Sequence, residues 1–207
     1  MSVRNNLSEE EVTDERKLKA IIVTGPSGSG KGSVAKKILE TFDSFCLSIS
    51  ATTREPGPGE EHGKDYYFIS REEFKKKIDE GAFVEYEEVY QGNFYGTLFE
   101  EMEHIVSRGR MPLFEIDVAG ALRIRKILGE NAVVIFLHPG EPVIEVLRGR
   151  LRNRKRDSEE KIEKRLKKAL DEIAMGRSSD YIVVNEDGKF KETITSVFGI
   201  IKSFLKK

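Results

Sequence analysis

The sequence predicts an α/β fold in which helices cover both faces of a mostly parallel β-sheet. Two observations predict it. Short apolar segments rich in β-branched or aromatic residues alternate with longer segments of helical periodicity, which is typical of parallel sheets and their crossover helices. The first apolar segment also runs directly into a glycine-rich turn that a helical segment follows.

The expected elements follow one another along most of the chain. Strands are expected at residues 19–24, 45–50, 111–117, 132–137 and 180–184. Helices are expected at residues 34–42, 98–109, 121–129, 142–151, 160–174 and 191–205. Residues 1–18 are charged and poor in large apolar groups, so we expect them to form an N-terminal extension outside the folded domain.

Two regions interrupt the alternation. Residues 53–97 combine a turn-rich loop, a capping box at Ser70–Glu73 and a strand with a glycine turn, which indicates an inserted lobe. Between Arg148 and Arg156, six of the nine residues are basic. A solvated helix face and a site for phosphate groups are the two explanations of such a run.

Composition excludes several classes of protein. Lys and Arg number 35 against 36 Asp and Glu, so the whole chain has no charge bias toward nucleic acid or membrane. Cys46 is the single cysteine, which rules out an internal disulfide. No apolar run approaches the roughly 18 residues of a spanning helix. We therefore expect a cytoplasmic protein without nucleic-acid or membrane partners, and the oligomeric state stays open.

The stretch IIVTGPSGSGKGSV, residues 21–34, carries the strongest functional signal. Gly25, Gly30 and Lys31 match the G-x-x-x-x-G-K spacing of a phosphate-binding loop between a strand and a helix. Such glycines let backbone N–H groups converge on an anion, the helix N-terminus adds positive potential, and the lysine reaches the β- and γ-phosphates. The residues expected to bind a nucleoside triphosphate are Gly25, Pro26, Ser27, Gly28, Ser29, Gly30, Lys31, Gly32 and Ser33.

The residue after the lysine departs from the usual loop. Gly32 stands where a Ser or Thr commonly holds Mg²⁺, and the hydroxyl comes one position later at Ser33. The sequence GKGS resembles the GKGT of nucleoside monophosphate kinases, in which the nucleotide's phosphates and water hold most of the metal. We therefore expect Mg²⁺ as a cofactor with ATP, and no dedicated metal ligand from the protein.

Two carboxylates lie where a strand of the predicted sheet ends. Glu115 and Asp117 are two residues apart, so both project on one face, and the carboxyl ends of parallel strands are where ligands bind. A helix cap or a solvated loop charge is the alternative explanation of Asp117.

An ordered set of motifs resembles the guanylate kinase family of P-loop kinases from about residue 19 onward. The motifs are GPSGSGKGS, SISATTR, GKDYYF, FVEY, GNFYGT, FEID and RLRNR. The resemblance implies a three-layer α/β/α P-loop fold whose core is residues 19–52, 98–143 and 169–207. It also implies a GMP-binding lobe at 53–97, a mobile helical lid at 144–168, and Mg²⁺-dependent phosphoryl transfer from ATP to GMP, with dGMP as a further acceptor.

The same resemblance implies roles for single residues. Glu85 would read the N1–H and 2-amino donors of guanine, a pair that adenine lacks. Asp117 or Glu115 would assist, and Ser50 and Thr97 would serve the O6 and N7 side. The expected phosphate contacts are Arg54, Tyr66 and Tyr95 for GMP, with Lys31, Arg150, Arg154 and Arg165 as the catalytic cations. Asn185 would lie near the adenine of ATP, or else be a turn residue.

One departure from the family pattern bears on GMP binding. The usual TTR-x-P-R-x-G-E reads TTREPGPGE here, so Gly57 replaces an arginine that would clamp the GMP phosphate. Two alternatives remain open at this point: a kinase on the same scaffold with a phosphorylated sugar as acceptor, and a non-catalytic domain that binds phosphoproteins. The latter class lacks a competent phosphate loop and lid, whereas Lys31, Arg150 and Arg165 are present.

Overall fold

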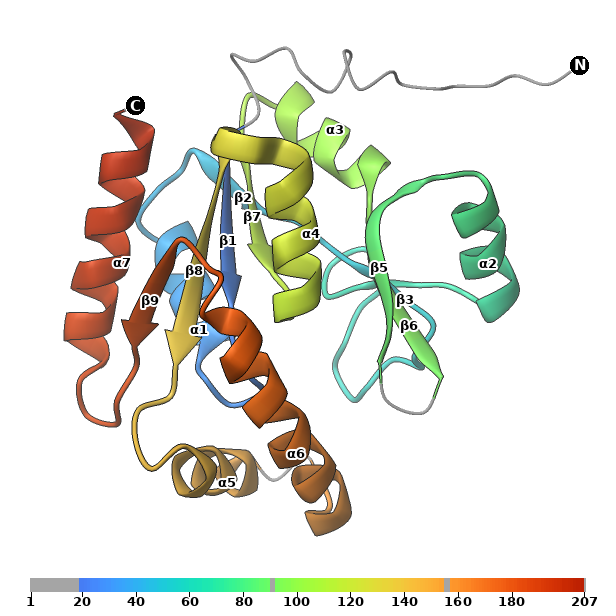
Figure 1. Ribbon diagram of the computed structural model, residues 1–207. Helices are drawn as coiled ribbons and strands as arrows, with labels where there is room; N and C mark the ends of the chain where they lie inside the picture. Colours follow the sequence, from blue (N-terminus) through green and yellow to red (C-terminus); the bar gives the residue numbers. More distant parts are fainter. Residues whose placement is uncertain (1–18, 90–91, 155–156, 207) are drawn as a thin grey trace, which may run out of the picture.

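The computed structural model describes residues 19–89, 92–154 and 157–206 (Figure 1). Its central sheet has the order β2-β7-β1-β8-β9, and every pair of neighbouring strands is parallel. The strands are β1 (Ala20–Thr24), β2 (Phe45–Leu47), β7 (Met111–Glu115), β8 (Ala132–His138) and β9 (Tyr181–Val184). The predicted α/β fold with a parallel sheet is therefore confirmed.

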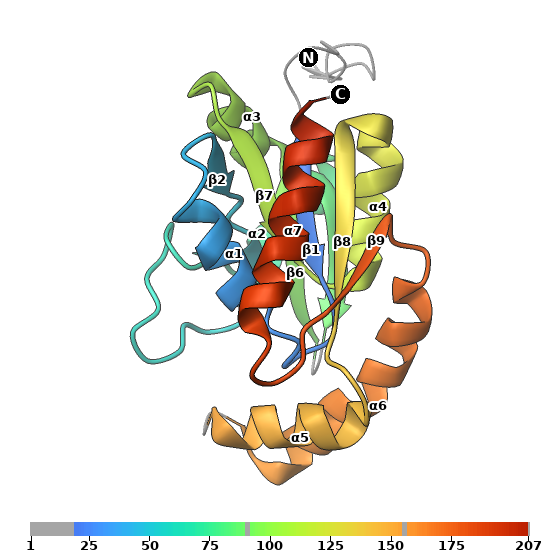
Figure 2. The same cartoon turned by 90° about the vertical axis from the view of Figure 1, so that its left-hand side faces the viewer.

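Helices cover both faces of this sheet (Figure 2). The helices α1 (Lys31–Leu39) and α7 (Phe190–Leu205) cover one face, whereas α3 (Phe99–Ser107) and α4 (Val118–Leu128) cover the other. A 3-10 turn, η1 (Gly129–Asn131), joins α4 to β8. Successive residues of β1 serve opposite faces: Ile21 packs with α1 and α7, and Ile22 packs with α3 and α4. A strand buried on both faces explains why residues 20–24 read as a continuous apolar run.

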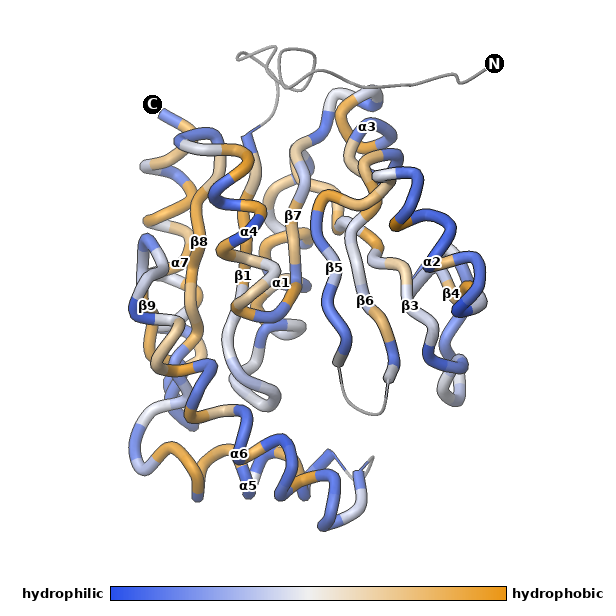
Figure 3. Tube along the Cα trace, turned by 45° about the vertical axis from the view of Figure 1, so that its right-hand side comes forward, coloured by the Kyte–Doolittle hydropathy of each residue, from blue (hydrophilic) through white to orange (hydrophobic). Residues whose placement is uncertain are grey.

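A second, smaller sheet lies beside the first (Figure 3). Its order is β4-β3-β6-β5, built from β3 (Ala51–Thr52), β4 (Tyr67–Phe68), β5 (Phe83–Val89) and β6 (Asn93–Leu98). The helix α2 (Arg71–Asp79) packs on it through Phe74, whose ring stacks on Phe83 with centroids 4.3 Å apart. The predicted capping box is present, since the Ser70 hydroxyl accepts a hydrogen bond from the Glu73 N–H at 3.1 Å.

Two helices lie at the carboxyl ends of the central strands, α5 (Val143–Asn153) and α6 (Glu159–Gly176) (Figure 1). They pack on each other through an apolar seam of their own, formed by Leu147, Leu151, Ile162, Leu166 and Ala169. No helix in the described part of the chain is long and apolar enough to span a membrane.

Several predicted boundaries were wrong, among them the helix expected at 34–42, which is Lys31–Leu39, and the strand expected at 111–117, which ends at Glu115. Two further differences have local causes. The strand expected at 45–50 ends at Leu47, because the Ile49 N–H bonds to the Glu101 carboxylate at 3.0 Å and leaves the ladder. The helix expected at 121–129 begins earlier, at Val118, because Asp117 caps it by accepting a hydrogen bond from the Gly120 N–H at 2.9 Å.

Candidate active site

The glycine-rich turn wraps the start of α1 in a backbone conformation that only glycine adopts readily. Gly25, Gly28 and Gly30 have φ values of 142°, 94° and 99°. A Cβ atom at Gly25 would lie 2.6 Å from the Leu137 carbonyl oxygen, and one at Gly30 would lie 2.4 Å from the Asn185 amide nitrogen. The loop is therefore fixed by close packing against β8 and the residue after β9 as well as by its own torsion angles.

Lys31 lies at the head of α1 with its ammonium folded back over the loop. Its Nζ donates hydrogen bonds to the carbonyl oxygens of Gly25 at 2.6 Å and Pro26 at 3.2 Å. Burial lowers the pKa of Lys31, and the nearby carboxylates of Glu115 and Glu172 oppose that shift. The lysine is thus a half-buried cation whose ammonium lies within the curve of the loop.

Asn185 is buried and bonded at both ends of its amide. Its Nδ2 donates to the Ser29 carbonyl oxygen at 2.7 Å, and its Oδ1 accepts from the Thr193 hydroxyl at 3.2 Å. These bonds tie the phosphate loop to the start of α7. The expectation that Asn185 contacts adenine stays a prediction. The hydrogen bonds that its side chain makes to Ser29 and Thr193 were not suggested by the sequence.

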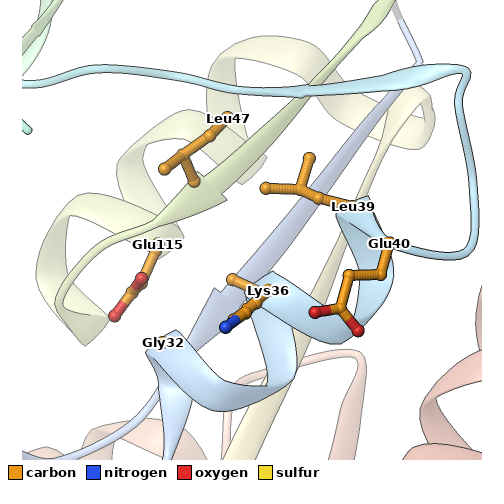
Figure 4. A pocket seen from close by; sticks show the side chains of 7 residues that line it. Gly32, Lys36, Leu39, Glu40, Leu47 and Glu115 are labelled. Carbon is orange, nitrogen blue, oxygen red and sulfur yellow. The ribbon is translucent and has the colours of Figure 1, made fainter. Parts of the chain in front are cut away.

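Glu115 ends β7 beside the first turn of α1. A Cβ atom at Gly32 would lie 3.3 Å from its Oε1, so the missing side chain at position 32 leaves room for this carboxylate. Burial raises the pKa of Glu115, while Lys31 and Arg154 oppose the rise. Figure 4 shows the carboxylate at the edge of a cavity of about 320 Å³ between α1, β2 and β7, with Leu39 and Leu47 among its apolar lining.

Three of the predicted guanine-reading residues, Glu85, Thr97 and Asp117, lie close together. The Thr97 hydroxyl donates to Glu85 Oε1 at 3.0 Å. A Cβ atom at Gly120 would lie 2.7 Å from Glu85 Oε2 and 3.4 Å from Asp117 Oδ1, so both carboxylates border the same glycine. Burial raises the pKa of Glu85 to about 7, and the negative charge of Asp117 adds to the shift. Ser50 lies on the connection that enters β3.

Arg54, Tyr66 and Tyr95 form a second group at the far end of the smaller sheet. Arg54 Nε donates to the Tyr95 hydroxyl at 3.1 Å, and the guanidinium lies 5.4 Å from the centroid of the Tyr66 ring. Glu60, which the sequence analysis did not single out, joins this group, because its Oε1 accepts from Arg54 Nη2 at 3.0 Å. Burial raises the pKa of the Tyr66 hydroxyl to about 12, so this group stays neutral near pH 7.

Arginines of α5 and α6 form hydrogen bonds with the phosphate loop. Arg165 Nη1 donates to the Ser27 hydroxyl at 2.6 Å. Arg150 Nη2 donates to the Asn185 carbonyl at 2.6 Å, and its Nη1 donates to the Gly28 carbonyl at 3.3 Å. Arg154 is the C-terminal cap residue of α5. Its positive charge contributes to lowering the pKa of Lys31 and opposes the rise in the pKa of Glu115. All three predicted arginines therefore lie around the loop.

Three further charged residues near Asp117 were missed by the sequence analysis. Lys168 Nζ lies 3.5 Å from Glu87 Oε1, 3.8 Å from Asp117 Oδ2 and 3.8 Å from Glu172 Oε1. Burial raises the pKa of Glu172 to about 7. The four-residue spacing of Lys168 and Glu172 on one helix face was the only available signal, and that spacing is common on exposed helices.

Comparison with known proteins places the chain in a family. The family model described as guanylate kinase matches residues 17–204. A guanylate kinase from Chlorobaculum tepidum is 42% identical over 199 residues, which cover 96% of this chain and 98% of that protein. One from Porphyromonas gingivalis is 44% identical over 170 residues, with coverage of 82% and 89%.

Solved structures agree with these matches. The crystal structure of a guanylate kinase from Anaplasma phagocytophilum has a TM-score of 0.69 and 35% identity, with coverage of 90% of this chain and 86% of that one. A shikimate kinase from Acinetobacter baumannii, at 18% identity and a TM-score of 0.50, shares the fold alone. The extent of the family match and the identity to its members lead to one conclusion: this chain belongs to the guanylate kinase family.

Proposed function

We propose that this chain transfers the γ-phosphoryl group of ATP to GMP, giving ADP and GDP. The observation that carries the proposal is the meeting of two groups of side chains at the carboxyl ends of the central strands. Lys31, Arg150 and Arg165 surround a phosphate loop, and the carboxylates of the buried Glu85 and the half-buried Asp117 lie together beside Gly120. The first group suits a triphosphate, and the second suits a base that presents hydrogen-bond donors.

Guanine fits the second group through its Watson–Crick edge. In the ionised state Glu85 offers acceptors to N1–H and the 2-amino group, and Asp117 lies close enough to share the second donor. Adenine presents an acceptor at N1 and would leave a buried carboxylate unpaired, which is a strong basis for discrimination. Ser50 and Thr97 then serve the O6 and N7 side. The ribose takes no part in this scheme, so dGMP is expected to be a second acceptor.

The arrangement also supports the proposed division of the chain. The smaller sheet with α2 corresponds to the GMP-binding lobe at 53–97, where Arg54, Tyr66 and Tyr95 would hold the GMP phosphate. The helix pair α5–α6 corresponds to the lid at 144–168. Its contacts with the loop are the hydrogen bonds of Arg165 to Ser27 and of Arg150 to Gly28, and the packing of Leu147 beside Gly28, where a Cβ atom would lie 3.3 Å from Leu147 Cδ2. The two helices share an apolar seam of their own, so we expect them to move as one unit.

The protein's part in phosphoryl transfer is alignment and charge neutralisation. Lys31 would give up the carbonyl oxygens of Gly25 and Pro26 for oxygens of the β- and γ-phosphates. Arg150, Arg154 and Arg165 would surround the transferred group and exclude water as the lid closes. Asn185 would keep the Ser29 carbonyl turned away from the phosphates and so hold the loop N–H groups inward.

Magnesium fits this site chiefly through the nucleotide. Mg²⁺ typically keeps several waters and takes one or two carboxylates in addition to phosphate oxygens. Glu115 supplies a carboxylate beside Gly32, and the Ser33 hydroxyl follows in the first turn of α1. Mg²⁺ would neutralise charge on the β- and γ-phosphates.

The experiment that tests the proposal follows both products. The protein is incubated with ATP, Mg²⁺ and GMP, and ADP and GDP are separated by chromatography. We expect ADP and GDP in equal amounts and none of either with Lys31→Met. ADP without GDP would indicate hydrolysis and would refute the proposed acceptor. A cytoplasmic location stays a prediction.

A further inference from the structure

Glu60 lies on the loop between β3 and β4 and binds Arg54, the residue expected to hold the phosphate of GMP. Its Oε1 accepts from Arg54 Nη2 at 3.0 Å, and its Oε2 lies 2.8 Å from Arg54 Nη1. Oε2 also accepts from the backbone N–H of Gly57 at 2.7 Å. A guanidinium bound through two nitrogens, together with a backbone N–H, is a donor set typical of sites for carboxylate or phosphate anions.

Two further donors of Arg54 are committed as well. Nε donates to the Tyr95 hydroxyl at 3.1 Å, and Nη1 donates to the Glu55 carbonyl at 2.7 Å. Each of the three guanidinium nitrogens therefore already has a partner within this lobe. A phosphate dianion that binds Arg54 through two of its nitrogens has to displace at least one of these partners, and Glu60 is the only one of these three partners that carries a negative charge at neutral pH.

The Arg54–Glu60 ion pair is partly shielded from solvent, so its electrostatic interactions are stronger than those of an exposed pair. The side chains of Arg54 and Glu60 are 29% and 27% exposed, and the rings of Tyr66 and Phe68 lie 5.4 and 5.7 Å from the guanidinium carbon. Low exposure strengthens both the attraction between Glu60 and Arg54 and the repulsion between Glu60 and a phosphate. Gly57 adds no side-chain cation beside Glu60, although a Cβ atom there would lie only 3.1 Å from its Oε2.

We propose that Glu60 is an internal competitor of the acceptor phosphate and thereby sets the affinity for GMP. The carboxylate holds Arg54 and the Gly57 N–H in an anion-binding arrangement, and the phosphate of GMP takes over these donors when it binds. The inference rests on the proposed function. Its distinctive consequence is that removing the Glu60 charge strengthens binding of GMP and leaves binding of guanosine, which has no phosphate, unchanged.

The test compares GMP with guanosine, which has the same base and no phosphate. Dissociation constants for both are measured by isothermal titration calorimetry for the wild type, Glu60→Gln and the control Glu61→Gln. Glu61 lies next in sequence and its side chain pairs with Lys64 at the surface, so its substitution removes the same charge away from Arg54. For Glu60→Gln we expect GMP to bind about fivefold more tightly, because a neutral hydrogen bond competes less strongly than a charged one.

We expect guanosine affinity to be unchanged in Glu60→Gln, and both affinities to be unchanged in Glu61→Gln. Equal or weaker GMP binding by Glu60→Gln would overturn the inference and would make Glu60 a positioning residue for Arg54. Tighter binding of guanosine would overturn it as well. Glu60→Ala, which removes the carboxylate entirely, should change GMP affinity in the same direction, and thermal unfolding verifies the fold of each variant.

Turnover by the wild type separates this inference from the proposed function. If the wild type converts GMP and the Glu60 variants do not bind it more tightly, the inference alone is wrong. If the wild type neither binds nor converts GMP, the proposed function is wrong and the inference falls with it.

Discussion

Substituting Glu85 by Gln separates guanine reading from phosphoryl transfer. Gln keeps the size of Glu85 and an oxygen that can accept from the Thr97 hydroxyl, now 3.0 Å from Oε1. Its other terminal atom is an NH₂ donor, which would face a donor of guanine. Losing one hydrogen bond to a charged acceptor costs about 1.5–3 kcal/mol. The KM for GMP should therefore rise roughly ten- to a hundredfold.

The same substitution should leave the phosphate loop and the three arginines unaffected. We therefore expect kcat to change much less than KM, and the ratio of kcat/KM for GMP over AMP to fall. Initial rates of ADP formation over a GMP titration measure the effect, and Glu88→Gln, on the same strand, is a matched control. An unchanged KM for GMP in Glu85→Gln would refute the assignment of Glu85 as the guanine reader.

The pKa of Glu85 adds a pH dependence with a definite sign. The folded-state pKa is about 7, above the ordinary value of 4.5 for a glutamate, so the folded chain binds more protons than the unfolded chain between these values. Stability should fall as pH rises from 4.5 to 7, by an amount on the order of 3 kcal/mol for this group. Glu85→Gln should lack that loss, and wild-type GMP binding should weaken below pH 7 as Glu85 becomes protonated. Urea unfolding and GMP titrations at several pH values measure both effects.

Three further substitutions test the phosphate loop and the acceptor lobe. Lys31→Met should abolish turnover with little change in thermal stability; substantial remaining activity would contradict the role given to its ammonium. Gly30→Ala should reduce ATP affinity and stability, since φ is 99° and the new Cβ would lie 2.4 Å from the Asn185 amide nitrogen; normal ATP affinity in calorimetry would show that the loop tolerates the change. Gly57→Arg should lower the KM for GMP with little effect on kcat, because the new cation lies beside Glu60 and competes with Arg54 for it; a raised KM in the same assay would contradict this.

The parts of the fold predicted well are those with a local cause. The strand expected at 19–24 is Ala20–Thr24, and the helix expected at 191–205 is Phe190–Leu205. Periodicity and the glycine spacing of the phosphate loop are properties of short segments, so they could be read directly. The match to the guanylate kinase family confirms the family that the ordered motifs indicated.

The rest depends on contacts between segments far apart in the chain. Asn185 and Ser29 are 156 positions apart, and Arg165 and Ser27 are 138 positions apart. No local sequence pattern could therefore predict either hydrogen bond. The early end of β2 has the same origin, because Glu101 from α3 takes the Ile49 N–H. Glu60 was missed although it lies only six residues from Arg54, because a turn at Gly57 brings the two together.

The central claim is that the carboxylates of Glu85 and Asp117 select guanine as the acceptor base, and one comparison tests it most directly. ADP formation from ATP and Mg²⁺ is measured with GMP, dGMP, AMP, UMP or no acceptor, over a titration of each. The account predicts high kcat/KM for GMP, measurable turnover with dGMP, and rates with AMP and UMP near that without acceptor. Equal turnover with AMP, or no turnover with GMP in a protein that binds ATP, would contradict it.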